Sequence, residues 1–180
     1  MTALATDLVQ FWRDAGPERW FRGGKSFDAA CREQWMDAHM RASRGELDHW
    51  MDTLESAFAL ILLCDQLPRN MFRGSAHAYA TDPLGRAVAD HAIARGFDRD
   101  IDPEMRRFFY LPFTHAEDAA LQQRSVDLHR GMPGEEPDKW ALHHQAIITR
   151  FGRFPHRNPL FGRTTTAEEQ AWLDADGFSG

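Results

Sequence analysis

Apolar residues recur along this chain with a helical spacing, and no stretch alternates apolar and polar positions as a half-buried strand does. The longest apolar run, from Ala57 to Cys64, is apolar on nearly every side, which is typical of a central helix. We expect this helix to extend from about Asp52 to Gln66. The pattern therefore predicts an all-α protein.

Proline, glycine and capping residues indicate where the other helices begin and end. Thr81-Asp82-Pro83 predicts the start of a helix over Leu84–Arg95 that stops at Gly96, and Asp102-Pro103 predicts a short helix ending near Phe109. Four more starts are predicted at Ser26, with a helix to Arg41, at Thr114 with Glu117, at Asp138, and at Thr166 with Glu169. We expect about eight helices in a single domain over residues 1–180.

Composition places the chain in a broad class. Its 180 residues are enough for a core without disulfides or a metal, and Cys31 and Cys64 have no metal-ligand spacing. Because the chain has no signal-peptide pattern and no apolar run long enough to span a bilayer, we expect a soluble, cytoplasmic protein without a membrane partner. Its net charge of -6 argues against nucleic-acid binding, and we expect no cofactor and a monomer or weak dimer.

A basic and aromatic segment without acidic residues lies near the end of the chain. Arginine offers a rigid fork of donors for carboxylate or phosphate, and apolar neighbours keep such a fork partly out of water, where it needs an anionic partner. The polar members of the segment are Arg150, Arg153, His156, Arg157, Asn158 and Arg163, and the aromatic members are Phe151, Phe154 and Phe161. This segment is the first candidate for a binding site.

A similar segment follows the apolar run. Pro68-Arg69-Asn70 resembles the residues around Pro155, and the restriction before proline predicts that both helices end there in a sharp bend, which we call an elbow. Arginine and asparagine side chains are then expected to bond the carbonyls freed at the helix end. Asp65 falls on the buried face of the central helix, so we expect an ion pair with Arg69 or with an arginine of the other elbow.

A third polar cluster comprises residues 110–118, where Tyr110 and His115 have no capping role and Glu117 fits a capping box with Thr114. His144 lies on the same predicted helix face as Trp140 and Ile147, where a satisfied core histidine is the commoner situation than a ligand.

These motifs together resemble a bacterial family known as domain of unknown function 924. The residues that carry the resemblance are Phe11-Trp12, Trp20-Phe21, Leu62–Asn70, Ala80–Pro83, Tyr110–Asp118, Arg150–Asn158 and Thr166–Glu169. The resemblance covers almost the whole chain, with departures such as Cys64 and Leu67 that remove no charged residue. It implies a helical fold similar to the tetratricopeptide-like right-handed superhelix, and it implies no activity, substrate or catalytic residue.

Three functional hypotheses follow. In the first, the elbows and His115 meet at one concavity that binds a small anionic ligand or a peptide carboxylate, with Asp65 as a supporting ion pair. The residues assigned to this binding are Arg69, Asn70, Tyr110, Arg153, Arg157, Asn158 and Arg163, beside His156.

In the second hypothesis, the protein is an enzyme of the hydrolase type, with His115 or His156 as base, Glu117 or Asp65 as acid or orienting group, and arginines that stabilise developing negative charge. A metal-assisted variant adds His144, but no pair of these residues has the spacing of a metal motif. In the third, the clusters are ion pairs that hold the elbows together.

Overall fold

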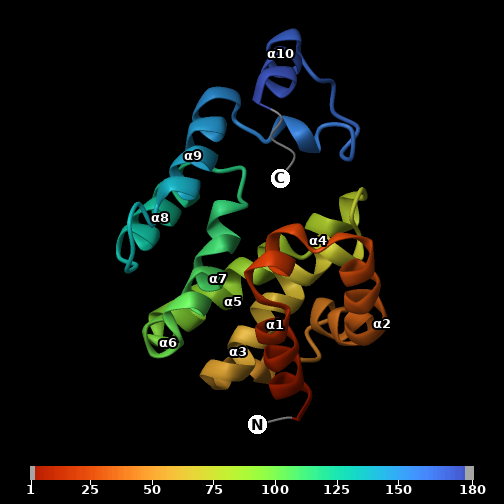
Figure 1. Ribbon diagram of the computed structural model, residues 1–180, viewed down its shortest axis with the longest axis vertical. Coiled ribbons are helices and arrows are strands. Elements are labelled where there is room, and N and C mark those ends of the chain that lie inside the picture. The colour runs from red at the N-terminus through yellow and green to blue at the C-terminus, as the bar shows by residue number, and fades with distance from the viewer. Residues whose placement is uncertain (1–2, 177–180) are drawn as a thin grey trace. The chain divides into compact units, whose positions relative to one another are not determined.

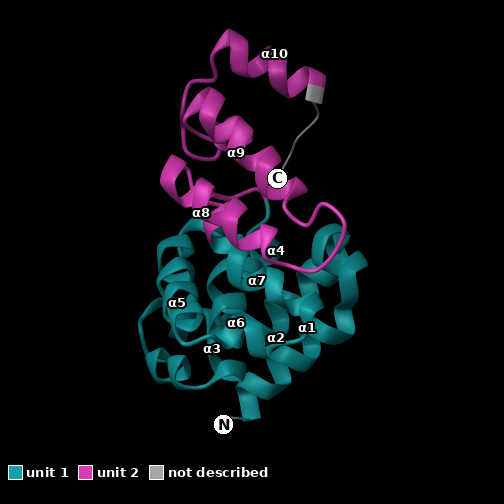
Figure 2. Ribbon diagram, turned by 90° about the vertical axis from the view of Figure 1, so that its left-hand side faces the viewer, with its two compact units in different colours: residues 1–73, 77–112 teal, residues 74–76, 113–180 magenta. Residues whose placement is uncertain are grey.

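The computed structural model describes residues 3–176, and within that range all regular secondary structure is helical. The prediction of an all-α protein is confirmed. The chain forms two compact units: unit 1 holds the residues up to 73 and 77–112, and unit 2 holds residues 74–76 and those from 113 onward (Figure 2). The single domain and the tetratricopeptide-like superhelix stay predictions.

Unit 1 is built around α3 (Figure 1). Its elements are α1 (Ala3–Arg22), α2 (Gly24–Ser43), the 3-10 helix η1 (Asp48–Asp52), α3 (Leu54–Ile61), the π-helical turn η2 (Leu62–Gln66), α4 (Leu67–Met71), the 3-10 helix η3 (Ala76–Tyr79), α5 (Asp82–Ala94), α6 (Phe97–Asp100) and most of α7 (Pro103–Thr114). Helix α3 packs against α1 and α5, and α2 packs against η2 and α4.

Unit 2 contains the end of α7 and the rest of the helices. These are α8 (Ala119–Arg130), α9 (Lys139–Phe151), the 3-10 helix η4 (Pro155–Arg157) and α10 (Ala167–Asp176). Helices α8 and α9 pack side by side, and Ile147, Ile148 and Phe154 form a small buried core. None of the helices described has both the length and the apolar character needed to cross a membrane.

Several predicted helix ends are confirmed and others are wrong. Helix α5 begins at Asp82 and is followed by Gly96 in the left-handed region (φ 79°), as predicted. Helix α7 begins at Pro103 but does not end near Phe109, because it tolerates Pro112 and continues to Thr114. Helix α2 begins at Gly24, two residues before the predicted cap Ser26.

The two predicted capping boxes have opposite outcomes. The one before α10 is confirmed, since Thr166 N–H donates to Glu169 at 2.8 Å and Glu169 N–H donates to Thr166 Oγ1 at 3.2 Å. The one at Thr114 is wrong, because α7 extends through Thr114. Asp118 caps α8 instead, through a bond from Leu121 N–H at 2.9 Å.

The central helix does not end in an elbow at Pro68, and this prediction is also wrong. The chain stays helical from Leu54 to Met71 because η2 widens the helix just before the proline. The N–H of Leu67 reaches back five residues to the carbonyl of Leu62, as in a π-helix, and Pro68 has no N–H to donate. The carbonyls of Leu63 and Cys64 therefore lose their usual helical partners.

Three side chains bond carbonyls of this turn: two bond those of Leu63 and Cys64, and one bonds that of Asp65. His39 Nδ1–H of α2 donates to Leu63 O at 2.9 Å, and the Thr81 hydroxyl, at the start of α5, donates to Cys64 O at 2.6 Å. Arg69 donates to the next carbonyl, that of Asp65. Burial lowers the pKa of His39, so a neutral imidazole makes its bond. Gly85 allows α5 to come this close, because a Cβ there would lie 3.4 Å from the Cβ atoms of Cys64 and Asp65.

The fully buried carboxylate of Asp65 makes its predicted ion pair with Arg69, at 3.4 Å, and accepts a bond from Gln66 Nε2 at 2.6 Å. Arg69 also forms a two-point contact with Asp82 at 3.0 and 3.2 Å. Burial acts to lower the pKa of Arg69, but the two aspartates outweigh it and the pKa is raised. One arginine thus links the π turn to the start of α5.

Replacing Thr81 by valine should destabilise the protein by about 1–3 kcal/mol, because the buried Cys64 carbonyl would lose its only hydroxyl donor while the side-chain shape is kept. Urea denaturation measures the difference. Thr149→Val, at an exposed position of α9, is the control and should leave the free energy of unfolding within about 0.5 kcal/mol of the wild-type value. Equal midpoints for both variants would show that the Thr81 bond does not stabilise the turn.

Asp65→Asn should cost about 2–5 kcal/mol, since Arg69 would lose one of its two counter-charges in a buried place. The matched control is Asp37→Asn on the exposed side of α2. Thermal and urea unfolding of the three proteins check the prediction, which fails if Asp65→Asn and Asp37→Asn unfold at the same midpoint.

Candidate functional site

The basic and aromatic segment forms the turn between α9 and α10 in unit 2. Helix α9 ends at Phe151, and Gly152 takes the left-handed conformation (φ 69°) that closes it, with its N–H on Ile148 O at 2.8 Å. After this cap, η4 begins at Pro155. The chain does turn before Pro155, unlike at Pro68, but the predicted cause is wrong, because Gly152 and not the proline ends the helix.

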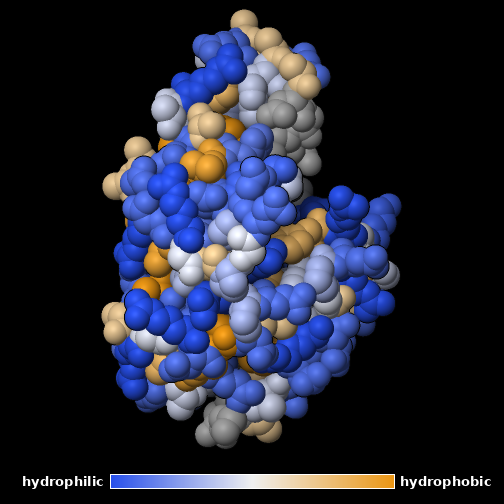
Figure 3. Space-filling view, turned by 60° about the vertical axis from the view of Figure 1, so that its left-hand side comes forward, coloured by the Kyte–Doolittle hydropathy of each residue, from blue (hydrophilic) through white to orange (hydrophobic). Residues whose placement is uncertain are grey.

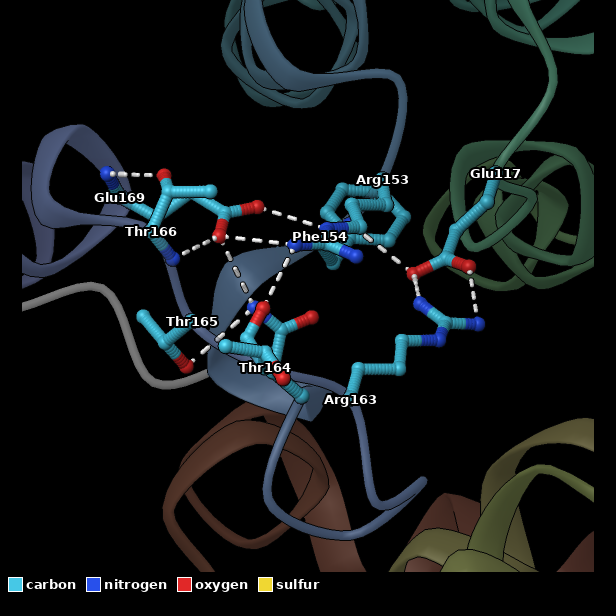
Figure 4. A network of polar contacts seen from close by, with 9 residues as sticks. Glu117, Arg153, Phe154, Arg163, Thr164, Thr165, Thr166 and Glu169 are labelled. Atoms are coloured by element: carbon cyan, nitrogen blue, oxygen red, sulfur yellow. Dashed lines mark hydrogen bonds and ion pairs between the residues drawn. The ribbon is translucent and has the colours of Figure 1, made fainter.

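Glu169 of α10 holds the first half of this turn (Figure 4). Its carboxylate, almost fully buried, accepts two bonds from Arg153 at 2.6 and 2.9 Å and one from Asn158 Nδ2 at 3.2 Å. The Arg153 bonds, more than any other contact, lower the pKa of Glu169 to about 2, and the backbone N–H of Thr166 adds to the shift. Arg153 and Asn158 are thus committed to a carboxylate of the same unit.

Glu117 holds the second half of the turn. It accepts bonds from Arg163 Nη1 at 2.9 Å and from the backbone N–H of Phe154 at 2.9 Å, and Arg163 Nη2 lies 2.8 Å from its other oxygen (Figure 4). Partial burial acts to raise the pKa of Glu117, but these bonds outweigh it and the pKa is lowered. Because Glu117 stays ionised near neutral pH, it is poorly suited to be the proton donor of the enzyme hypothesis.

Arg157 differs from its neighbours in the kind of partner it contacts. It is buried, with 6% of its surface exposed, and Nη1 donates to the backbone carbonyl of His115 at 3.0 Å. Its guanidinium carbon lies 4.4 Å from the centre of the Phe154 ring. These two contacts are with uncharged groups of the same unit, and the charge of Arg157 also acts on Glu117, where it helps to lower the pKa of that carboxylate.

Two imidazoles, those of His144 and His156, lie against the ring of Phe154, and two more lie beside His144. The ring of His144 lies 5.6 Å from that of Phe154, 6.4 Å from that of His115 and 6.0 Å from that of His143, and the ring of His156 lies 5.7 Å from that of Phe154. We call His115, His143, His144, His156 and Arg157 the basic cluster.

His144 shows how these groups act on one another. Burial is the main cause that lowers its pKa, to about 3, and the nearby charges of His115, His143 and Arg157 lower it further. Its Nδ1–H donates to Trp140 O at 2.8 Å, so the neutral ring presents Nε2 as an acceptor. A histidine with so low a pKa is a weak base, which makes His144 a poor general base.

The other predicted binding residues belong to unit 1. Tyr110 is buried and donates its hydroxyl to Asp98 at 2.6 Å; burial and this bond raise its pKa. Asn70 donates to Gln66 O at 3.2 Å and accepts from Arg73 at 3.2 Å. That these residues and Arg69 share one concavity with His115 and His156 stays a prediction.

A metal centre is not formed by the side chains that the structure describes, since no three or more His, Cys, Asp or Glu residues among them are placed to hold an ion. The four metal ligands considered from the sequence were His115, Glu117, His144 and His156. Of these, Glu117 accepts hydrogen bonds from Arg163 and the Phe154 N–H.

Two features of the site were missed in the sequence. His143 was not singled out, although it lies one turn after Trp140, whose ring it contacts at 6.1 Å. Trp140 was placed on the buried face of α9, but 67% of its surface is exposed. The helical spacing alone gave no sign of this, because Trp140 lies in the first turn of α9, beyond the small core of Ile147 and Ile148.

Glu169→Gln should destabilise the protein by about 1.5–3 kcal/mol at pH 7, the value of a hydrogen bond to a charged group. Because the pKa of Glu169 is lowered to about 2 from 4.5, the contribution of its carboxylate to the stability of the fold is complete above pH 4.5 and is lost as the pH falls toward 2. The difference in the free energy of unfolding between wild type and variant, measured by urea denaturation, should therefore become smaller below pH 4.5.

The adjacent pair provides the control for this prediction. Glu168 bonds Arg150 at 2.9 Å with both side chains more than half exposed, so Glu168→Gln should cost about 0–1 kcal/mol. Equal effects of the two substitutions would contradict a special role for Glu169.

The comparisons agree with the resemblance noted in the sequence. A solved structure of a protein of unknown function from Agrobacterium tumefaciens has a TM-score of 0.93 and 51% sequence identity to this chain, covering 96% of this chain and 98% of that one. No curated protein matches the chain. Residues 8–177 match the family described as "Bacterial protein of unknown function (DUF924)". This protein is therefore a member of the DUF924 family.

Proposed function

We propose that unit 2 binds a small anion, a carboxylate or a phosphate, through the basic cluster around Phe154. The observation that carries the proposal is a group of basic side chains in one place: His144, His156 and Arg157 lie against Phe154, and His115 and His143 lie beside His144. Imidazole N–H groups and a guanidinium fork are donors suited to anionic oxygens. The three remaining arginines of the original hypothesis are not part of this proposal.

The division among the arginines follows from their partners. Arg69, Arg153 and Arg163 each form two-point contacts with a carboxylate of their own unit, at Asp82, Glu169 and Glu117. A ligand would have to displace these carboxylates to reach the guanidinium groups, and each displacement loses charge-assisted hydrogen bonds that are worth about 1.5–3 kcal/mol. These arginines are better explained as structural.

Mutual repulsion within the basic cluster supports an anionic ligand. Burial is the main cause of the lowered pKa of His144, and the charges of His115, His143 and Arg157 add a smaller repulsive contribution in the same direction. An anion bound among His115, His156 and Arg157 would replace this repulsion by attraction, and the low exposure of Arg157 would reduce screening by solvent. The protein is then a binding module rather than an acid–base catalyst.

Citrate and inorganic phosphate should raise the melting temperature of the protein and give a saturable heat of binding in calorimetry. At about a hundred times its dissociation constant, a ligand that binds only the folded state stabilises it by about 2.7 kcal/mol. His115→Gln combined with His156→Gln should weaken binding about tenfold or more, because two donors are changed while the side chains stay polar.

A matched control uses two exposed histidines of unit 1, His49 and His91, replaced by glutamine in the same way. This control should bind citrate and phosphate as the wild type does. If neither anion binds, or if both double variants bind alike, the basic cluster is not an anion site.

A further inference from the structure

A hollow on unit 2 lies between α9 and α10, next to His143 of the basic cluster, and has a volume of about 170 Å³. We call it the α9/α10 groove. Its lining residues are His143, Ala146, Ile147, Arg150, Phe151 and Trp172.

The walls of the groove are largely apolar. The rings of Phe151 and Trp172 lie 5.4 Å apart and pack against the small core of Ile147, Ile148 and Phe154. Because His144, His156 and Arg157 also lie against Phe154, groove and cluster rest on the same core. The face of the molecule seen in Figure 3 is largely hydrophilic, with only small hydrophobic patches.

One guanidinium and one imidazole border the groove. His143 belongs both to the groove and to the basic cluster, since its ring lies 6.0 Å from that of His144. Arg150 lies over the ring of Phe151 at 4.8 Å and pairs with Glu168 at 2.9 Å, in a contact that is half exposed and therefore weak. The groove thus combines an apolar floor with the positive charge of Arg150 at its edge and the imidazole of His143 on its cluster side.

We infer that the ligand of unit 2 is a small carboxylic acid with an apolar tail, an alkyl or aryl carboxylate. The carboxylate lies at the basic cluster on the His143 side, and the tail lies on Ile147, Phe151 and Trp172. This inference rests on the proposed anion binding and adds the class of ligand. A volume of about 170 Å³ is below the range of about 300–1,000 Å³ of ligand pockets, so the groove suits only the tail, as one ring or a short alkyl chain.

Calorimetry with octanoate, acetate, octan-1-ol and inorganic phosphate tests the inference. Octanoate should bind about tenfold or more tighter than acetate, because burying even two methylene groups contributes about 1.6 kcal/mol. Octan-1-ol should bind about tenfold or more weaker than octanoate, because it has the tail without the charge.

A substitution at the groove tests the contribution of the tail to binding separately from that of the carboxylate. Ala146 is exposed and lines the groove, so Ala146→Phe should fill the space without disturbing the core and reduce octanoate binding to the level of acetate. Phosphate binding at the cluster should be unchanged in this variant. Ala87→Phe, at an exposed position of α5 in unit 1, should leave the binding of all four compounds unchanged.

The possible failures are distinguishable. If phosphate and acetate bind but octanoate binds no tighter than acetate, or keeps its affinity in Ala146→Phe, the inference about the tail is wrong and the anion site stands. If octan-1-ol binds as well as octanoate, the groove is apolar without selecting a carboxylate and the inference is also wrong. If none of the four binds, both the inference and the proposed anion site are overturned.

Discussion

The requirement that buried backbone carbonyls be hydrogen-bonded organises unit 1. Pro68 lies in the most deeply buried helix of the unit and removes one donor, and the π turn before it redirects another. The carbonyls of Leu63 and Cys64 are consequently bonded by side chains of α2 and α5, so that helices distant in sequence must dock at fixed positions along the central one. A local irregularity of the backbone thereby specifies tertiary packing.

In unit 2, two carboxylates accept the hydrogen bonds of the turn after α9. Its turn after α9 contains arginines and exposed backbone donors, and Glu117 and Glu169 each accept from both kinds of group, namely a guanidinium and a backbone N–H. Each glutamate therefore fixes the path of the chain as well as neutralising a charge. The basic cluster belongs to the same unit: Arg157 donates to the His115 carbonyl, and the rings of His144 and His156 lie against Phe154.

The sequence predicted the parts of this structure that depend on local signals. The Asp-Pro starts of α5 and α7, the capping box of Thr166 and Glu169 and the helical class needed only neighbouring residues. It failed where a distant group decides the outcome: the helix passes Pro68 because His39 and Thr81 supply donors, and Glu117 leaves the capping pattern because Arg163 and Phe154 bind it. The acidic partners of Arg153 and Arg163 were not predicted for the same reason, because the basic and aromatic segment itself contains no acidic residue.

Two successive residues of α10 differ in how the surrounding solution can affect them. Glu168 and Arg150 meet in water, within reach of mobile counterions, whereas Glu169 and Arg153 are largely shielded from them. Raising the ionic strength should therefore loosen the first contact and leave the second almost unchanged. Dissolved salt then acts on Arg150 at the edge of the groove, while the turn beneath keeps its shape.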